Sequence, residues 1–216
     1  MRILDERVER YLRDLRPERS EVMAEMEEVA ARDSVPIVQW ETGRLLATLC
    51  RTFDPTVLEV GTAIGYSTLH MAEQLDHGRV VTLELDPDRA AQARRYLERA
   101  GVAEHVEVVE GDALETLPRL DGPFDLLFVD AAKGEYARYI ELAEPKLAER
   151  ALLVVDNLLM DGEVALPAGA GAGHRWNADS LAAARRLNAD LMRAERWLAS
   201  VLPVGDGVGL AVRLAR

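Results

Sequence analysis

The chain has 216 residues, 49% hydrophobic and 30% charged, which is the balance of an ordinary globular protein. Its formal net charge of −12 argues against broad nonspecific binding to nucleic acid, because such binding depends on lysine and arginine facing phosphates. No apolar run reaches the roughly 18 residues that would suggest a membrane span. The start lacks the apolar segment of a signal peptide, and a single cysteine, Cys50, cannot form an internal disulfide. We therefore expect a cytoplasmic protein without a membrane partner.

The N-terminal quarter of the chain predicts helices. Residues 3–33 are charged and carry apolar residues at spacings of three and four, which is typical of amphipathic helices. Pro17 interrupts this pattern, so a second helix is expected over 18–32. Pro36 disfavours helix just before it, and a third helix is expected over 38–51.

Further along, short apolar segments rich in valine and leucine run into glycine, aspartate or asparagine. We expect strands over 56–62, 79–86, 106–112, 124–131 and 151–157. Helical patterns separate and follow them, over 64–75, 87–100, 113–119 and 134–148. Alternation of continuous apolar strands with helices predicts a parallel sheet covered on both faces.

The end of the chain departs from this alternation. A helix is expected over 180–196, before two apolar runs that flank Asp206 and Gly207. An Asp-Gly pair in that position predicts a hairpin turn, so the sheet is expected to end in an antiparallel pair.

The chain carries no internal repeat and no clear domain boundary. Residues 166–173, LPAGAGAG, form a low-complexity segment that predicts a flexible loop. We take 1–216 as one domain, with 1–52 as a helical N-terminal part and 53–216 as the core.

A glycine turn, VLEVGTAIGYS, joins the first strand to the next helix. In an open α/β sheet, ligands bind beyond the carboxyl ends of the strands. Glu84 closes the second strand, 19 residues after Gly65, which suits an acid that accepts hydrogen bonds from a ribose. A dinucleotide fingerprint would need glycine where Ala63 and Tyr66 stand, so a nucleoside without phosphates fits better.

S-adenosylmethionine is such a nucleoside. Its amino-acid tail and its sulfonium favour nearby polar and acidic groups such as Glu59 and Ser67. The alternative is that Gly61 and Gly65 only form the tight turn of any α/β protein.

Polar side chains end the fourth and fifth strands, namely Asp130 on the fourth and Asp156 with Asn157 on the fifth. If these strands are neighbours, they lie about 4.8 Å apart, and the three side chains meet at one rim. Carboxylate and amide oxygens suit Mg²⁺, and also Mn²⁺ or Ca²⁺. The alternative is that each residue only caps a helix or turns the chain.

Lys133 follows Asp130 closely and is one of two lysines among 26 basic residues. An arginine there would stay charged, whereas a lysine, with an ordinary pKa of about 10.4, can lose its proton beside a dication in a buried site. The alternative is a solvated lysine that pairs with Glu135 or another acid.

Six motifs together resemble the metal-dependent class I O-methyltransferases, the group that contains catechol and caffeoyl-CoA O-methyltransferases. They are LEVGTAIGYS, TLELDP, EGDALE, FVDAAKGEY, VVDN and PVGDG, in family order over about residues 35–212. The resemblance implies a Rossmann-like α/β fold with a seven-stranded, mostly parallel sheet, an antiparallel last strand, helices on both faces and extra N-terminal helices. It also implies an enzyme that uses S-adenosylmethionine and a divalent cation, and a homodimer.

The resemblance further implies roles for individual residues. Lys133 resembles the catalytic base, which takes the proton from the hydroxyl that is methylated. The implied metal ligands are Asp130, Asp156 and Asn157. The implied cofactor contacts are Val38, Glu59, Gly61, Thr62, Ser67, Glu84, Asp112, Ala113 and Asp130.

Two methyl acceptors remain open. A small catechol-like aromatic substrate and the 5-hydroxyuridine of tRNA both offer two neighbouring oxygens to a metal ion. The motifs VPIV, LEVGTAIGYS and DAAKGEY look closest to tRNA 5-hydroxyuridine methyltransferases, but the loop after the fifth strand carries only His174 and Arg175 as basic residues. We expect the small aromatic acceptor and keep tRNA as the alternative. Trp176 either closes over the substrate or belongs to a surface loop.

Overall fold

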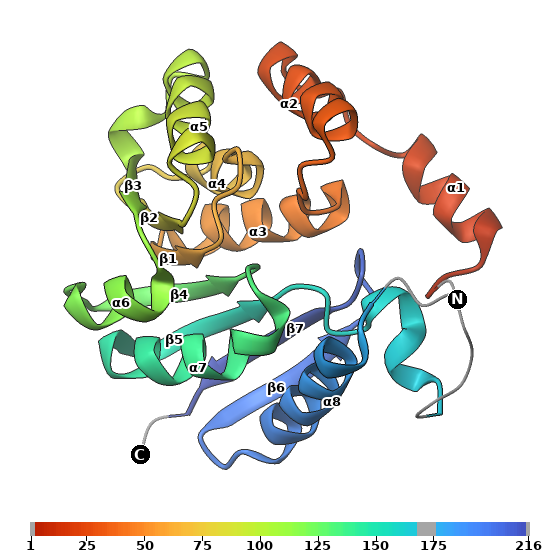
Figure 1. Ribbon diagram of the computed structural model, residues 1–216. Coiled ribbons are helices and arrows are strands. Elements are labelled where there is room, and N and C mark those ends of the chain that lie inside the picture. Colours follow the sequence, from red (N-terminus) through yellow and green to blue (C-terminus); the bar gives the residue numbers. More distant parts are fainter. Residues whose placement is uncertain (1–2, 168–175, 215–216) are drawn as a thin grey trace.

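The computed structural model describes residues 3–167 and 176–214, which include a seven-stranded sheet with helices on both faces (Figure 1). The strands are β1 (Thr56–Val60), β2 (Arg79–Glu84), β3 (Val106–Glu110), β4 (Phe124–Val129), β5 (Leu147–Val155), β6 (Trp197–Leu202) and β7 (Val208–Arg213). The helices are α1 (Glu6–Asp14), α2 (Glu21–Asp33), α3 (Trp40–Phe53), α4 (Tyr66–Ala72), α5 (Pro87–Arg99), α6 (Ala113–Thr116), α7 (Tyr136–Ala143) and α8 (Ala178–Arg193).

The strand order is β3-β2-β1-β4-β5-β7-β6. All pairs from β3 to β5 are parallel, and β7 runs antiparallel to both β5 and β6. The predicted parallel sheet and its antiparallel end are therefore confirmed, and Asp206 and Gly207 lie in the β6–β7 connection as the hairpin prediction required. The order reverses between β1 and β4, where an open α/β sheet leaves a crevice for ligands.

Both faces of the sheet are buried, which explains the continuous apolar strands. On β4, Phe128 packs into the cluster that includes Leu69 of α4. Its neighbours Leu127 and Val129 point the other way, into the cluster that includes Ile140 of α7. Because successive side chains of a strand face opposite sides, each side needs its own helical layer.

The boundary between α7 and β5 differs from the prediction. We expected a helix to residue 148 and a strand from 151, but α7 ends at Ala143 and β5 begins at Leu147. Pro145 lies in the short 3₁₀ turn between them. Proline cannot donate a backbone hydrogen bond, so the helix stops early and the strand starts sooner.

The N-terminal helices differ in how they contact the rest of the molecule. Helices α2 and α3 contribute buried side chains to the core, whereas α1 has no buried residue and projects away from the sheet (Figure 1). The link around Pro17 separates α1 from α2, as the sequence predicted. The predicted flexible loop over 166–173 lies mostly outside the described residues, as do His174 and Arg175.

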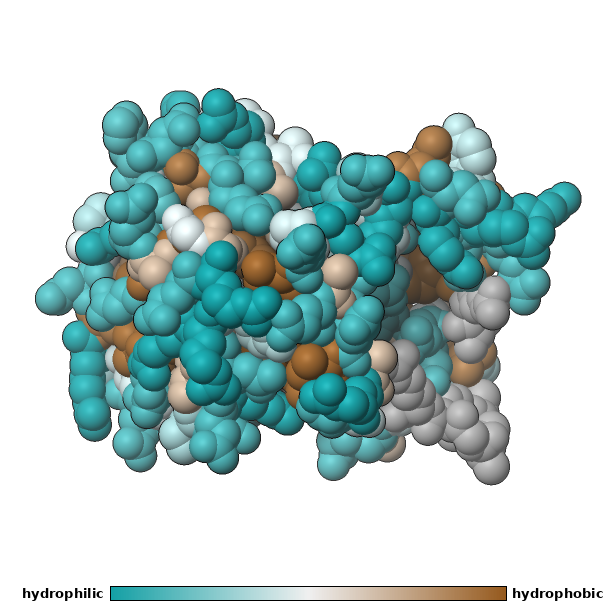
Figure 2. All heavy atoms as spheres, turned by 90° about the horizontal axis from the view of Figure 1, so that it is seen from above, coloured by the Kyte–Doolittle hydropathy of each residue, from teal (hydrophilic) through white to brown (hydrophobic). Residues whose placement is uncertain are grey.

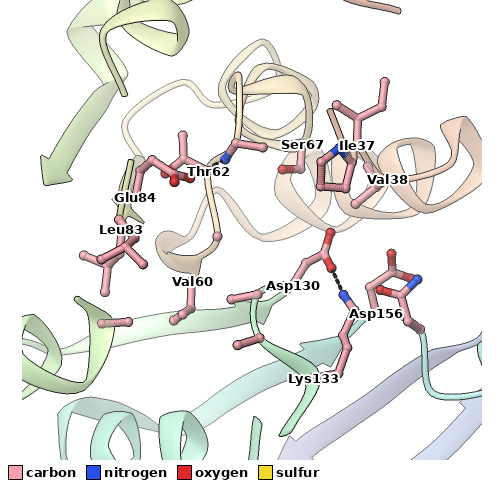
Figure 3. A pocket seen from close by; sticks show the side chains of 18 of the residues that line it. Ile37, Val38, Val60, Thr62, Ser67, Leu83, Glu84, Asp130, Lys133 and Asp156 are labelled. Atoms are coloured by element: carbon pink, nitrogen blue, oxygen red, sulfur yellow. Dashed lines mark hydrogen bonds and ion pairs between the residues drawn. The ribbon is translucent and has the colours of Figure 1, made fainter. Parts of the chain in front are cut away.

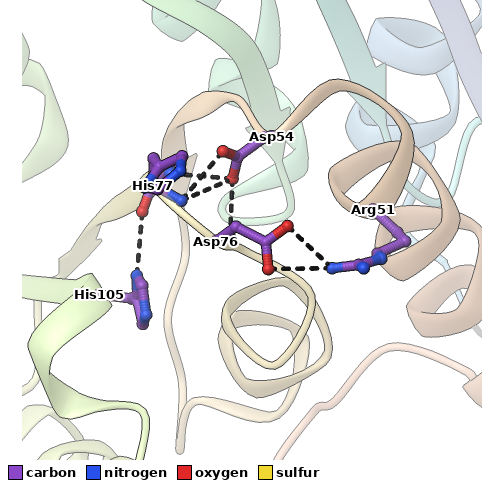
Figure 4. A network of polar contacts seen from close by, with 6 residues as sticks. Arg51, Asp54, Asp76, His77 and His105 are labelled. Carbon is purple, nitrogen blue, oxygen red and sulfur yellow. Dashed lines mark hydrogen bonds and ion pairs between the residues drawn. The ribbon is translucent and has the colours of Figure 1, made fainter.

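A polar network fixes the amino ends of β1 and β2 (Figure 4). The Asp54 carboxylate accepts hydrogen bonds from the backbone N–H groups of Asp76, His77 and Gly78, each at 2.9 Å. These donors, Gly78 first, lower the pKa of Asp54. The network lies at the amino ends of the strands. An open α/β sheet binds its ligands at the other edge, beyond the carboxyl ends.

Hydrophilic residues cover most of the face shown in Figure 2, with apolar residues scattered between them. Within the ranges given above, no helix combines the length and the apolar character that crossing a membrane requires.

Candidate active site

A pocket of about 620 Å³ opens beside the carboxyl ends of the central strands, where the strand order reverses (Figure 3). All predicted site residues except Glu59 line it. They are Val38, Gly61, Thr62, Ser67, Glu84, Asp112, Ala113, Asp130, Lys133, Asp156 and Asn157. The fold therefore gathers into one cavity residues from most of the chain, and the role of each stays a prediction.

The glycine turn after β1 requires glycine at position 61. Gly61 has φ +104°, and a Cβ there would lie 2.0 Å from the backbone oxygen of Asp130. Ala63 also adopts a positive φ, 48°, and its N–H donates to Glu84 Oε2 at 2.7 Å. The turn thus brings the ends of β1, β2 and β4 into close contact.

Glu84 supports this turn from the end of β2. Its second carboxylate oxygen, Oε1, accepts from the N–H of Asp86 at 2.9 Å, and the residue is only 7% exposed. Because each carboxylate oxygen has two lone pairs, Glu84 can still accept from a ribose hydroxyl. Asp112 is exposed and caps α6 by accepting from the N–H of Leu114 at 2.8 Å.

Glu59 lies beneath the pocket instead of lining it. Its side chain is fully buried and accepts from the hydroxyls of Ser67 and Thr68, each at 2.5 Å. Burial raises the pKa of Glu59 to about 7. The residue supports Ser67, which lines the pocket, and its direct contact with a cofactor stays a prediction.

Lys133 is held by two partners at the pocket wall. Its Nζ donates to Asp130 Oδ1 at 2.5 Å and to the Tyr136 hydroxyl at 2.7 Å. The side chains of Lys133 and Asp130 are 16% and 18% exposed. Lys133 therefore pairs with another acid, Asp130, and not with Glu135, which instead accepts from the hydroxyl of Tyr139.

The ends of β4 and β5 form the predicted rim. The backbone N–H of Asp156 donates to the Val129 carbonyl at 3.1 Å, which sets Asp156 beside the end of β4, next to Asp130. Asp156 is 2% exposed, and its Oδ1 has no hydrogen-bond partner. Burial first, and the Asp130 carboxylate second, raise the pKa of Asp156 to about 8. Neither aspartate caps a helix, although Asp156 lies in the bend that follows β5 and Asn157 has φ +60°.

This rim fits a divalent cation. A buried carboxylate oxygen without a partner costs free energy that a bound cation would offset. No group of three or more His, Cys, Asp or Glu side chains in residues 3–167 and 176–214 is arranged to hold a metal ion. Two carboxylates would thus need the amide oxygen of Asn157 as a third ligand, which is an oxygen-only set suited to Mg²⁺.

The sequence analysis left three residues in or next to the pocket without a definite role. Tyr136 is one helical turn from Lys133, a spacing that brings side chains together. Asp206, read only as a turn residue, is 4% exposed and accepts from Asn157 Nδ2 at 3.2 Å. Trp176 lines the pocket, and its Nε1 donates to Asp161 Oδ2 at 3.1 Å.

Comparison with known proteins identifies the family of this chain. A family model described as O-methyltransferase matches residues 14–214. The chain is 34% identical to the catechol O-methyltransferase of Niastella koreensis, with 96% of each chain covered. It is 41% identical to the catechol O-methyltransferase of Mycobacterium tuberculosis over 74% of this chain and 72% of that one.

A solved structure agrees as well. The O-methyltransferase TomG from Streptomyces achromogenes, solved in complex with SAM, superposes with a TM-score of 0.83 at 30% identity, covering 96% of each chain. The pocket of this chain lies where an open α/β sheet binds a nucleoside, and its lining combines apolar side chains with six carboxyl groups. The chain therefore belongs to the O-methyltransferase family and is an S-adenosylmethionine-dependent O-methyltransferase.

Proposed function

We propose that this enzyme uses a divalent cation and methylates one of two neighbouring oxygens of a small, catechol-like aromatic molecule. Asp130, Asp156 and Asn157 would hold the cation, Mg²⁺ or another dication that prefers oxygen ligands, such as Mn²⁺ or Ca²⁺. The observation that carries the proposal is the buried, unpartnered Oδ1 of Asp156 in the same pocket as Lys133. When bound, the cation supplies positive charge that favours the ionised form of a substrate hydroxyl.

The residues of the glycine turn and of the next strand are proposed to hold S-adenosylmethionine, which supplies the methyl group on a cationic sulfur. Glu84 would accept from the ribose, and Asp112 with Ala113 would lie at the adenine. Val38, Gly61 and Ser67 would hold the amino-acid tail, as the family resemblance implied, and Thr62 would be a further cofactor contact. A cavity rich in carboxylates suits a ligand that carries a positive charge.

Lys133 is proposed to take the proton from the acceptor hydroxyl at its Nζ. Asp130 and Tyr136 both contact that nitrogen, so its position in the pocket is fixed before the acceptor arrives. A fixed base at the acceptor oxygen lowers the entropic part of the barrier. Lysine can serve in this role because it exchanges its proton, which arginine does not do in proteins.

The charge of the pocket supports a small acceptor without phosphates. Among the described lining residues, the bases are Arg89 and Lys133. The acids are Glu84, Asp112, Asp130, Glu135, Asp156 and Asp206. This excess of carboxylates disfavours a phosphate backbone, so we place catechol-like acceptors before tRNA. Two relatives named catechol O-methyltransferase support the same choice.

An acceptor panel tests this proposal. Methyl transfer from S-adenosylmethionine in the presence of Mg²⁺ is measured with catechol, with resorcinol and with tRNA that carries 5-hydroxyuridine. We expect product from catechol and far less from resorcinol, whose two hydroxyls are not neighbours. Equal rates with catechol and resorcinol would contradict chelation of two oxygens. Methyl transfer to the tRNA and to neither small molecule would show that 5-hydroxyuridine of tRNA is the acceptor.

We also propose that the protein forms a homodimer through α1. Val8, Tyr11 and Leu15 lie on one side of this helix and are 45%, 63% and 56% exposed. A second copy that covers this face would remove them from water. Light scattering is expected to give a dimer for the wild type and a monomer for Tyr11→Asp, and a monomeric wild type would refute the interface.

A cytoplasmic location stays a prediction from the sequence.

A further inference from the structure

We infer that Asp206 is a positioning residue that orients the amide of Asn157, so that the amide oxygen is available to the metal ion. The inference rests on the metal site of the proposed function. Asp206 Oδ2 accepts from Asn157 Nδ2 at 3.2 Å. An ionised carboxylate only accepts hydrogen bonds, so it selects the nitrogen end of the amide and leaves the oxygen end on the side of the pocket.

Asp206 can do this because its own position is fixed on both sides. Its Oδ1 accepts from the backbone N–H of Asp161, and the residue is 4% exposed. The backbone around it pairs with the segment that follows Asn157, since the N–H of Leu159 donates to the Asp206 carbonyl at 3.1 Å. Both carboxylate oxygens therefore have a donor, and an amide at this position could not satisfy both donors.

The next residue, Gly207, shows how closely the two segments pack. It has φ +89°, and a Cβ there would lie 2.5 Å from the backbone nitrogen of Leu159. Its carbonyl accepts from the N–H of Leu158 at 2.8 Å. The β6–β7 turn therefore packs closely against the loop after β5, and this packing places Asp206 beside Asn157.

This contact also explains why position 157 carries an amide. An aspartate there would set a second carboxylate against Asp206 in place of the donor that Asn157 Nδ2 provides. Asn157 itself adopts φ +60°, a conformation that asparagine tolerates better than most residues. Residues that orient a metal ligand from behind commonly affect metal affinity by about 10- to 100-fold when they are removed.

Substitution of Asp206→Asn tests the orientation. The new amide oxygen would still accept from the N–H of Asp161, and the new amide nitrogen would face Asn157 Nδ2. Two donors would then oppose each other, and the Asn157 amide would turn its nitrogen toward the metal. We expect Mn²⁺, titrated alone and followed by electron paramagnetic resonance, to bind about 10- to 100-fold more weakly. Affinity for S-adenosylmethionine, measured by calorimetry, is expected to change less than twofold.

The swapped pair Asn157→Asp with Asp206→Asn provides a rescue. It restores one donor and one acceptor between the two positions and still leaves an acceptor for Asp161. We expect Mn²⁺ affinity to return to within about threefold of the wild type or better. Asp54→Asn is the matched control, since it also removes a carboxylate that accepts backbone hydrogen bonds in a turn, but at the far end of the strands. It is expected to lower stability and leave Mn²⁺ affinity unchanged.

The outcomes separate this inference from the proposed function. Mn²⁺ affinity of Asp206→Asn within twofold of the wild type overturns the inference, as does a swapped pair that binds no better than Asp206→Asn alone. A wild type that binds no Mn²⁺ overturns the metal site instead. In that case the orientation is tested by nuclear magnetic resonance, from the side-chain amide signals of Asn157 in the proton–nitrogen spectrum. If Asp206→Asn leaves these signals unchanged, the inference about Asp206 is overturned as well.

Discussion

Lys133 Nζ lies 2.5 Å from Asp130 Oδ1 and 2.7 Å from the Tyr136 hydroxyl, so one nitrogen joins the end of β4 to the start of α7. This arrangement places a candidate base directly beside a candidate metal ligand. A dication held by Asp130 would therefore lie beside Lys133, the group proposed to take the substrate proton.

Replacement of Lys133 by arginine is expected to lower turnover by about 100-fold or more, because general base catalysis contributes roughly 10² to 10⁴. The positive charge stays, so affinity for S-adenosylmethionine is expected to remain within about threefold. Lys146→Arg is the control, since Lys146 donates to the Leu120 carbonyl away from the pocket. Initial rates and calorimetry measure both effects. Full turnover in Lys133→Arg would remove Lys133 as the base.

Gly61→Ala is expected to abolish cofactor binding and to destabilise the fold. Its new Cβ would meet the Asp130 carbonyl at 2.0 Å, where neither backbone can move without opening the β1–β4 pair. Gly101→Ala separates this clash from backbone strain, because Gly101 also has a positive φ, +74°, with no atom within 4 Å of the added Cβ. For Gly101→Ala only the backbone strain is expected, which lowers the free energy of unfolding by about 1–2 kcal/mol. Equal melting temperatures for the two variants would contradict the close contact.

Asp156→Asn is expected to stabilise the metal-free protein and to remove its response to metal. The substitution neutralises a buried carboxylate whose Oδ1 has no partner. At pH 8 the melting temperature without metal is expected to rise by about 2–4 °C for each kcal/mol gained. Mg²⁺ should raise the melting temperature of the wild type and leave that of the variant unchanged. A variant less stable than the metal-free wild type would show that Asp156 is satisfied without a cation.

Glu59 gives a pH dependence of stability. Burial raises its pKa from 4.5 to about 7, so the folded protein holds a proton that the unfolded chain has released between these values. The free energy of unfolding should therefore fall as pH rises from 4.5 to 7, by up to about 3 kcal/mol from this group. Glu59→Gln does not titrate, and its unfolding free energy should lose less over this window. Parallel pH profiles of the two proteins in urea denaturation would refute the buried, protonated Glu59.

Much of the site could be predicted from local sequence signals. Asp130 and Asp156 each end an apolar strand, and parallel neighbours bring their carboxyl ends to one edge. Gly61 was recognisable as a turn residue, although its contact with Asp130 is a property of the folded sheet.

The remaining features depend on contacts that no local pattern encodes. Asp206 reaches Asn157 only because β7 inserts between β5 and β6, a pairing between segments about fifty residues apart. Glu59 lies below the pocket because its position on β1 faces the buried layer under α4, and strand alternation alone did not say which layer held the ligand.

Metal dependence of catechol methylation tests the proposed chemistry most directly. Protein freed of metal by a chelator is mixed with S-adenosylmethionine and catechol, and methylated product is measured with and without added Mg²⁺. We expect product formation to depend on Mg²⁺ and to stop in excess EDTA. Equal rates with Mg²⁺ and with excess EDTA would contradict the assignment of Asp130, Asp156 and Asn157 as a catalytic metal site.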